Sequence, residues 1–443
     1  TFTSPLSKNI DFYGGVDFRY YKGVHTNELI DLYGGKYFID EASRKNVKAV
    51  NNAAAADPNW KMQKLQVGDV VYRDYDGYVV QEGAFGQVEG SFLEKALTAF
   101  VSGSLSNTTY WRYDRFYYDA EHARSKTLNF LGYNVKGGLN YNFASYHNVF
   151  VNTGYISRAP YFSGGAFLQS TTSNEINKNA INENIFSLEL GYGFHHRYLK
   201  ATINGYFTRW MNKTMTRANE YSYTDASGDI VNERAIINMS GVNARHMGVE
   251  LELRSNLTNW LELSAMLSLG DWQWDSNPIG YYYNSLGQPL ADLKGTVADA
   301  IGSGNHAWSQ LNLKGIKVGG SAQTTYDFGV TLRPVKELRL GLNLNGMSRL
   351  FADYTISSSN LIVNKPYDFV QPWQVPGAAL VDFNASYRFK FAGTTAVISG
   401  TCQNLLDQVY IADATNGNDG TWQTARVFYG FGRTWTTKLK INF

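Results

Sequence analysis

The strongest constraint on the fold of this chain is a repeated alternation of apolar and polar residues over segments of about ten residues. In the final segment every second residue is largely apolar, and this face carries Trp435, Leu439, Ile441 and Phe443, while Lys438 and Lys440 lie on the other face. Such alternation predicts a β-strand with one apolar and one polar side. A slip of one residue would reverse both faces, so its recurrence along the chain is informative.

The alternation predicts about fourteen strands, joined by connections that are alternately tight and long. The strands lie near residues 10–24, 83–94, 96–113, 131–143, 148–160, 184–195, 198–212, 245–257, 259–274, 322–334, 338–354, 379–391, 394–412 and 434–443. Long loops are predicted near 25–82, 114–130, 161–183, 213–244, 275–321, 355–378 and 413–433. Short turns at one rim and long loops at the other are typical of an outer-membrane barrel whose long loops lie outside the cell.

Composition favours the same class of protein. No apolar run approaches the roughly 18 residues that a membrane helix needs, whereas 31 Tyr, 25 Phe and 10 Trp give an aromatic content of 15%. Several aromatic residues fall at predicted strand ends, where a membrane interface would hold them. A soluble β-sandwich or propeller also alternates and is the competing interpretation. We predict an all-β, antiparallel transmembrane β-barrel.

Charge and cysteine content exclude other classes. The formal net charge of +2 does not suggest a nucleic-acid partner. The single cysteine, Cys402, cannot form an intramolecular disulfide or a cysteine-rich zinc site. The sequence contains no serine-hydrolase, zinc-protease, P-loop or dinucleotide fingerprint, so we expect no enzyme and no cofactor.

Several short stretches resemble the barrel of TonB-dependent outer-membrane receptors of the Bacteroidetes type. Residues 404–410 (Asn-Leu-Leu-Asp-Gln-Val-Tyr) resemble the Asn-Leu-Phe-Asp-x-x-Tyr signature of the penultimate strand, and 432–435 (Gly-Arg-Thr-Trp) resemble the start of the closing strand. Residues 154–160 resemble the mid-barrel arginine-proline stretch, and 245–252 resemble the strand with Gly-Val-Glu. Residues 17–23 and 76–83 add weaker matches. Their common order makes the set specific.

The resemblance implies a barrel of 22 strands plugged by an N-terminal domain. This chain would then supply about the last 14 strands, over 1–443, and nothing near Thr1 resembles the plug. The family's terminal aromatic is read as a sorting signal, which implies that Trp435, Leu439, Ile441 and Phe443 contact the barrel-assembly machinery. Outer-membrane lipid and the TonB complex, reached through a plug that is not in this chain, are further implied partners. A surface lipoprotein stays an open possibility.

The function implied by the resemblance is active import of a scarce nutrient across the cell outer membrane, with energy from TonB. Siderophore, haem, cobalamin, glycan and peptide all stay open as substrates. A passive outer-membrane channel and a surface-binding barrel protein without TonB coupling are the alternatives.

Aromatic side chains on the loops and strand ends are the predicted substrate contacts at the extracellular rim, because ring faces bury area without demanding hydrogen bonds. The residues are Trp111, Tyr113, Trp272, Trp274, Tyr282 and Trp422. Membrane-interface anchoring or loop packing is the competing explanation for such residues.

No metal site is predicted. Neighbouring residues on a strand point to opposite faces, so His195 and His196 are poorly placed to share a metal. Both lie near a predicted short turn, and we expect them to be surface histidines at the rim of short turns. Asp413, Asn416, Asn418 and Asp419 lack the spacing of a calcium loop, which favours an ordinary turn. Polar-face residues are predicted to line the lumen wall: Glu189, Glu250, Glu252, Arg254, Asp382 and Arg388.

Overall fold

The structure is a computed structural model of the chain. It describes residues 1–40, 63–168, 173–224, 227–284, 286–354, 356, 360–391, 393–417 and 419–442. In these ranges, no helix has the length and apolar character needed to cross a membrane.

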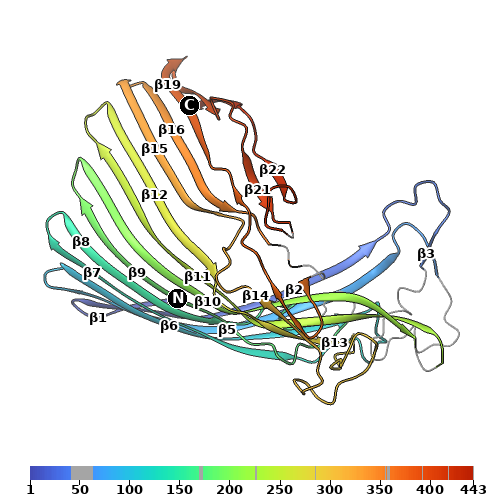
Figure 1. The fold of residues 1–443 in the computed structure, drawn as a ribbon. Helices are drawn as coiled ribbons and strands as arrows, with labels where there is room; N and C mark the ends of the chain where they lie inside the picture. Colours follow the sequence, from blue (N-terminus) through green and yellow to red (C-terminus); the bar gives the residue numbers. More distant parts are fainter. Residues whose placement is uncertain are drawn as a thin grey trace.

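The described residues form one large curved sheet with two small two-stranded sheets beside it (Figure 1). The strands are β1 (Phe2–Ser7), β2 (Ile10–Glu28), β3 (Phe38–Asp40), β4 (Gln63–Leu65), β5 (Val70–Phe92), β6 (Leu97–Asp114), β7 (Leu128–Ala144), β8 (His147–Arg158), β9 (Glu183–His195), β10 (Leu199–Thr224), β11 (Ile230–Asn256), β12 (Leu261–Trp274), β13 (Ile279–Tyr283), β14 (Trp308–Asn312), β15 (Ala322–Val335), β16 (Leu338–Phe351), β17 (Lys365–Asp368), β18 (Gln374–Val375), β19 (Ala378–Phe391), β20 (Thr394–Gln403), β21 (Ile411–Thr415), β22 (Arg426–Tyr429) and β23 (Thr434–Asn442).

The wall is an antiparallel meander in which each strand pairs with its neighbours in the sequence. It runs from β1 through β2, β5 to β12, β15, β16, β19 and β20 to β23. Loop strands β13, β14 and β17 extend the same sheet, with β14 and β17 parallel. No pairing joins β1 to β23 in the described part of the chain, so the wall is an open arc there.

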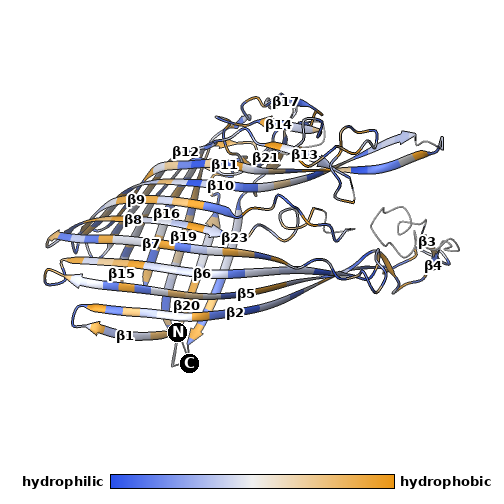
Figure 2. Ribbon diagram, turned by 90° about the horizontal axis from the view of Figure 1, so that it is seen from below, coloured by the Kyte–Doolittle hydropathy of each residue, from blue (hydrophilic) through white to orange (hydrophobic). Residues whose placement is uncertain are grey.

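Cross-strand register keeps the two faces of the wall chemically distinct. Leu190 lies opposite Gly205, Gly205 opposite Val249, and Val249 opposite Leu269, so apolar positions from four strands form one row. Leu190 is 64% exposed, and many large apolar side chains of the wall are similarly open on this face. Figure 2 shows the alternation of apolar and polar positions along the strands. Water would penalise such a surface, and a lipid bilayer accommodates it.

Each predicted segment overlaps one strand of the wall, but the boundaries differ at one rim. β10 and β11 continue as a paired hairpin to Thr224 and from Ile230, through the predicted loop 213–244. β2 and β5 likewise pair beyond the predicted limit, as far as Glu28 and Val70. Strand residues outside a bilayer need not alternate between apolar and polar. The alternation therefore did not predict these outer extensions of the strands. The pattern also did not predict β1, which contains Pro5 and lacks a clear apolar side.

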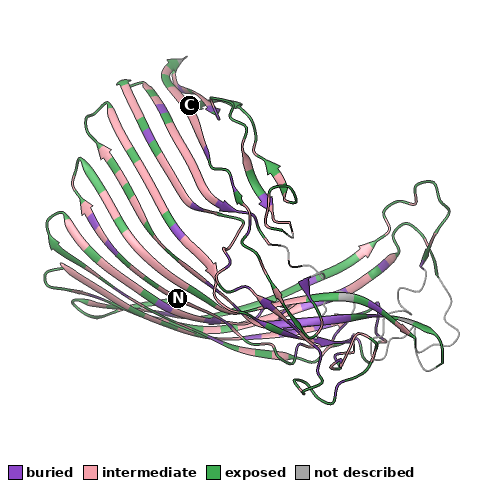
Figure 3. Ribbon diagram, in the orientation of Figure 1, coloured by how far each residue is buried: buried purple, intermediate pink, exposed green. Residues whose placement is uncertain are grey.

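Connections at the two rims differ sharply in length. At one end, which we call the short-turn rim, wall strands are joined by tight turns such as 196–198 and 257–260. At the other end, the loop rim, the connections are long and carry most of the buried hydrophobic side chains. Figure 3 shows the buried positions concentrated toward this rim. The packed core therefore lies in the loops rather than within the wall.

The stretch at 404–410 has a structural role in one of these connections. The Asn404 side chain accepts a hydrogen bond from Gln408 N and donates one to Gln408 O, both at 2.9 Å. Asp407 Oδ1 accepts a hydrogen bond of 2.8 Å from Arg433 N, and Asp382 Oδ1 accepts one of 2.8 Å from Asn404 N. These bonds tie the end of β20 to β19 and to the start of β23.

Candidate functional site

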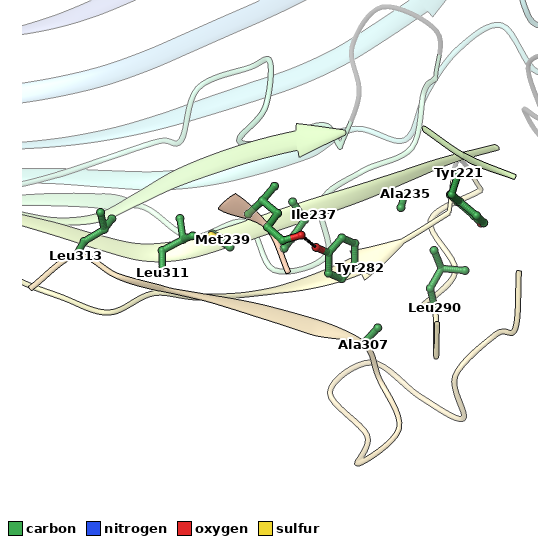
Figure 4. Packing of buried hydrophobic residues seen from close by; sticks show 10 residues of the cluster. Tyr221, Ala235, Ile237, Met239, Tyr282, Leu290, Ala307, Leu311 and Leu313 are labelled. Carbon is green, nitrogen blue, oxygen red and sulfur yellow. Dashed lines mark hydrogen bonds between the residues drawn. The ribbon is translucent and has the colours of Figure 1, made fainter. Parts of the chain in front are cut away.

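The long connections form an ordered layer that we call the loop cap, made of residues 275–284, 286–321 and 360–377 with the outer parts of β10 and β11. Its largest buried cluster joins Tyr221, Ala235, Ile237, Met239, Tyr282, Leu290, Ala307, Leu311, Leu313 and Leu361 (Figure 4). These residues come from the hairpin, from the β12–β15 connection and from the β16–β19 connection. Burial of such side chains, at about 25 cal/mol per Å² of apolar area, holds the connections against one another.

Tyr282 is part of this core, and its burial departs from its prediction as a residue of the extracellular rim. Its side chain is 0% exposed. Its hydroxyl lies 3.0 Å from Ser309 Oγ and donates a hydrogen bond to Leu361 O at 3.1 Å. Alternation predicts where strands lie but not how loops pack. It therefore does not distinguish a buried aromatic loop residue from an exposed one.

The cap also contains a buried histidine held in one tautomer. His306 Nδ1 accepts a hydrogen bond from Gly302 N at 2.8 Å, and Nε2 lies 2.8 Å from Tyr282 O, to which it donates. The ring stacks on Tyr281, with centroids 4.8 Å apart. Burial lowers the pKa of His306, so the neutral form is favoured.

A groove on the polar face of the wall combines aromatic and ionisable side chains, and we call it the lumen groove. Strands β6 to β12 build it, and its volume is about 660 Å³. Its main polar and aromatic side chains are Lys136, Glu189, Asn204, Tyr206, Trp210, His246, Glu250 and Trp272. Register brings them together, since Trp272 lies opposite His246 and His246 opposite Thr208.

Hydrogen bonds orient several of these groups. Trp272 Nε1 donates to the Tyr206 hydroxyl at 2.9 Å. Asn204 Nδ2 donates to Glu189 Oε1 at 3.1 Å and to Glu250 Oε2 at 3.3 Å. The groove thus presents oriented ring faces beside carboxylate acceptors, an arrangement that can stack on a ligand and accept hydrogen bonds from it.

The other five predicted rim residues lie in four different places. Trp111 and Tyr113 share the strand face of Leu105, which is the apolar face, and Trp111 stacks on Tyr78 with ring centroids 4.9 Å apart. Trp274 packs against the cap core, whereas Trp422 is 66% exposed between β21 and β22. Of the predicted set, the structure places Trp272 alone in the lumen groove.

Sequence reasoning missed Tyr206, Trp210 and His246 as parts of the groove. The alternation could have identified them. Tyr206 and Trp210 share the polar face of β10 with Asn204, and His246 shares the polar face of β11 with Glu250. The prediction instead followed aromatic residues in long loops and did not consider those on the inner wall.

Two ion-pair clusters stabilise the loop rim near β5 and β6. Arg115 pairs with Asp74 at 2.7 Å and with Asp76 at 2.8 Å. Arg115, aided by Lys22, lowers the pKa of Asp76 to about 2. In the second cluster, the fully buried Arg112 pairs with Asp114 at 3.0 Å and lies over the Tyr75 ring, 4.0 Å from its centroid.

The described parts of the chain contain no group of three or more His, Cys, Asp or Glu side chains suited to a metal ion. His196 lies in the turn between β9 and β10, where its Nδ1 is 3.4 Å from Tyr198 N. Asn416 Oδ1 accepts a hydrogen bond from Trp373 N at 3.0 Å, and Asp419 Oδ1 accepts one from Thr421 N at 3.0 Å. Asn418 lies outside the described residues.

The predicted lumen-wall residues keep their polar-face positions. Glu189 and Glu250 line the lumen groove. Glu252 and Arg254 lie further toward the short-turn rim, and Arg254 pairs with Glu262 at 2.6 Å. Asp382 and Arg388 occupy the polar face of β19. Of the predicted assembly signal, Trp435, Leu439 and Ile441 are exposed on the apolar face of β23, and Phe443 lies outside the described residues.

A wall that is apolar outside and polar inside, with long connections at one rim, defines the class of outer-membrane β-barrels. The family model for the TonB dependent receptor-like β-barrel matches residues 1–405, and the chain belongs to this family. It is therefore an outer-membrane protein of the TonB-dependent receptor family. The comparison with curated proteins gave no match.

Solved structures share the fold at low sequence identity. The copper transporter OprC is similar with a TM-score of 0.60 and 14% identity, over 100% of this chain and 55% of that one. The unliganded ferric citrate transporter FecA gives a TM-score of 0.57 and 13% identity, over 99% and 53%. The ferric preacinetobactin receptor BauA from Acinetobacter baumannii gives 0.56 and 13%, over 100% and 52%. The chain thus spans about half the length of these structures.

Proposed function

We propose that the chain forms the wall and loop cap of an outer-membrane active transporter that imports a scarce nutrient with energy from TonB. The observation that carries the proposal is the family match over 1–405. The lumen groove and the packed cap at one rim support it, because import needs a recognition surface inside the wall. We place the loop rim outside the cell, as is usual for such barrels.

The charge of the groove guides the choice of substrate. Its lining includes the carboxylates of Glu189 and Glu250 and the single ammonium group of Lys136. Neutral or cationic nutrients with a flat or ring-shaped surface fit this lining better than polyanionic chelates, because carboxylates repel anions. The names of the similar structures, with copper and ferric complexes, keep metal-bearing nutrients among the substrates to test.

The wider family context is also part of the proposal. TonB would act through a plug, and further strands would complete a barrel of 22 with about 14 from this chain. A Bacteroidetes origin, delivery by the barrel-assembly machinery and a surface lipoprotein partner stay proposals of the same kind.

Depletion of nutrients from the medium tests this function directly. Cells that express the full protein, with or without a working TonB, would be grown on a defined nutrient mixture whose components are followed by mass spectrometry. We expect at least one component to be depleted only with TonB, and a Trp272→Ala variant to slow this depletion about tenfold, as loss of a stacking contact worth about 1.4 kcal/mol would.

Arg388→Gln is the matched control, because this exposed arginine lies on the polar face but outside the groove. Equal depletion with and without TonB would replace the proposal with a passive channel. No depletion, together with retention of a surface partner, would replace it with a surface-binding barrel.

A further inference from the structure

A depression interrupts the apolar face of the wall, and we call it the lipid-face groove. Its volume is about 430 Å³, and its apolar lining comes from Leu188, Leu190, Gly205, Phe207, Met247, Val249 and Leu269. Gly205 of β10 lies in this lining between its strand partners, Leu190 of β9 and Val249 of β11. The missing side chain at this position leaves room between two exposed apolar neighbours.

Charged residues border this groove toward the loop rim. On β10 the apolar row ends at Phe207 and is followed by Arg209, and on β11 it ends at Met247 and is followed by Arg245. Lys317 and Arg349 join them through Asp271, which contacts the Lys317 ammonium and lies 4.0 Å from Arg349. Arg209 pairs with Asp275 at 3.0 Å. The four cationic side chains therefore meet two carboxylates, which leaves an excess of positive charge.

Arg245 has unused hydrogen-bonding capacity. Its Nη2 donates to Gln273 Oε1 at 3.5 Å, which is at the limit of a hydrogen bond. Within the described residues, its buried Nε has no hydrogen-bond partner. A buried guanidinium nitrogen without a partner is costly, and an anion at this edge would remove the cost.

We propose that the lipid-face groove binds a phosphorylated glycolipid of the outer leaflet, with an acyl chain on Gly205 and a phosphate on Arg245 and Arg349. Arginine binds phosphate through paired N–H groups, and the apolar row below it matches a hydrocarbon chain in the bilayer. The excess positive charge favours a lipid with two phosphates over a lipid with one. The inference rests on the proposed orientation, with the loop rim outside the cell, and it adds a site on the opposite face from the lumen groove.

Lipid retention tests the site without any transport measurement. The full protein, extracted in mild detergent, would be mixed with equal amounts of diphosphoryl lipid A, lipid A without phosphate and phosphatidylglycerol, and bound lipids would be read by native mass spectrometry. We expect the diphosphoryl form to be retained about tenfold over the others, and Arg245→Gln with Arg349→Gln to remove this preference, as for charge-assisted hydrogen bonds of about 1.5 kcal/mol.

A second variant separates the acyl-chain site from the charged edge. A Cβ added at Gly205 meets only Gly248 O, at 3.8 Å, so the Cβ of Gly205→Leu fits without a backbone clash, and we expect its side chain to occupy the groove. It should lower retention of diphosphoryl lipid A while Arg245 is unchanged. Gly400→Leu is the matched control, because Gly400 lies on the same face of β20 with nothing within 4 Å of an added Cβ.

Equal retention of the three lipids by the unmodified protein, or a preference for phosphatidylglycerol, would overturn the assignment. Unchanged retention in both the Arg245→Gln/Arg349→Gln and Gly205→Leu variants would do the same. Because the readout is bound lipid, these results are independent of whether TonB drives uptake.

Discussion

Individual aromatic side chains of the predicted rim have very different roles, and burial distinguishes them. Tyr282 lies in the cap core with two hydrogen-bonding partners, whereas Trp422 is largely open to solvent. The sequence identified both as candidates because residue type and loop position were the same. Only tertiary packing, which no local pattern encodes, separates an anchor from an open surface residue.

Replacing each side chain with alanine should change the stability of the loop cap by very different amounts. Tyr282→Ala should destabilise the loop cap by about 3–5 kcal/mol, as for other buried aromatic residues, and Tyr282→Phe by about 1 kcal/mol through loss of the hydroxyl. Trp422→Ala should stay within about 0.5 kcal/mol, as for an open surface site. Limited proteolysis of the cap at increasing urea concentration would rank the three variants by their loss of stability. Equal sensitivity of Tyr282→Ala and Trp422→Ala would contradict the assignment of Tyr282 to the core.

The buried pair of Arg112 and Asp114 makes a second prediction at this scale. Asp114 Oδ1 accepts hydrogen bonds from Phe116 N at 2.9 Å and Tyr117 N at 2.8 Å, so its charge orders the β6–β7 connection. Asp114→Ala should destabilise this connection by about 3–5 kcal/mol, because it leaves the Arg112 charge buried without its carboxylate.

Proteolysis of the 115–127 connection would measure the effect. Asp119→Ala is the control, since the Asp119 side chain in the same connection is 40% exposed and its ion pair with His122 contributes little. Cleavage at the same rate in both variants would show that the buried pair does not order this segment.

Individual strands of the wall could be predicted from sequence because lipid imposes the alternation on them. The β10–β11 extension could not, since it lies beyond the apolar rows and packs against the cap instead. The lumen groove was not predicted as a site. Trp272 was predicted at the extracellular rim, and Glu189 and Glu250 were assigned to the lumen wall. Their meeting with Tyr206 depends on register across β9 to β12. Register is a property of a pair of strands and cannot be predicted from the sequence of one strand alone.

Close packing between β15 and β16 gives a prediction for a strand pair. Tyr326 lies opposite Gly346, and a Cβ added at Gly346 would be 2.0 Å from Tyr326 Cζ. Gly346→Val should therefore displace the ring and destabilise the pair by about 1–3 kcal/mol. Gly400→Val, at an open position on the same face, should be neutral or stabilising because valine suits strands. The temperature at which the folded barrel loses its gel mobility would be compared for the two variants. Equal midpoint temperatures would contradict the close packing of Tyr326 against Gly346.

The cap should loosen as pH falls, through His306. Its pKa in the folded protein is lowered by burial, so the unfolded cap binds more protons and the neutral histidine favours the folded cap. Stability from this group is full above the unfolded pKa of about 6.5 and is lost as pH falls from there toward the lower folded pKa. Protonated Nδ1 can no longer accept the hydrogen bond from Gly302 N.

Hydrogen exchange would measure this loss. Relative to the intrinsic exchange rate at each pH, which itself falls as pH falls, amide exchange in 279–284 and 286–313 should accelerate between about pH 7 and pH 5, and His306→Gln should remove that acceleration. The same acceleration in the His306→Gln variant would assign the effect to another group.

At the scale of the whole molecule, the central claim is that one face of a continuous strand wall meets lipid and the other lines a lumen. All other conclusions depend on this: the lumen groove as the recognition surface, the lipid-face groove as a glycolipid site and the loop rim as the outer side. The claim explains why Leu342 is 46% exposed while its neighbours on the polar face hydrogen-bond across strands, as Asn345 does to Asp382 at 3.0 Å.

Spin labels placed one at a time from Leu340 to Asn345 on β16 test the central claim most directly. Cys402 is buried, so it contributes little labelling of its own. In lipid bilayers, labels at Leu340, Leu342 and Leu344 should be accessible to oxygen, and labels at Gly341, Asn343 and Asn345 to a water-soluble nickel chelate. That two-residue period is the result we predict. Equal access of the water-soluble reagent to both sets would contradict the transmembrane wall.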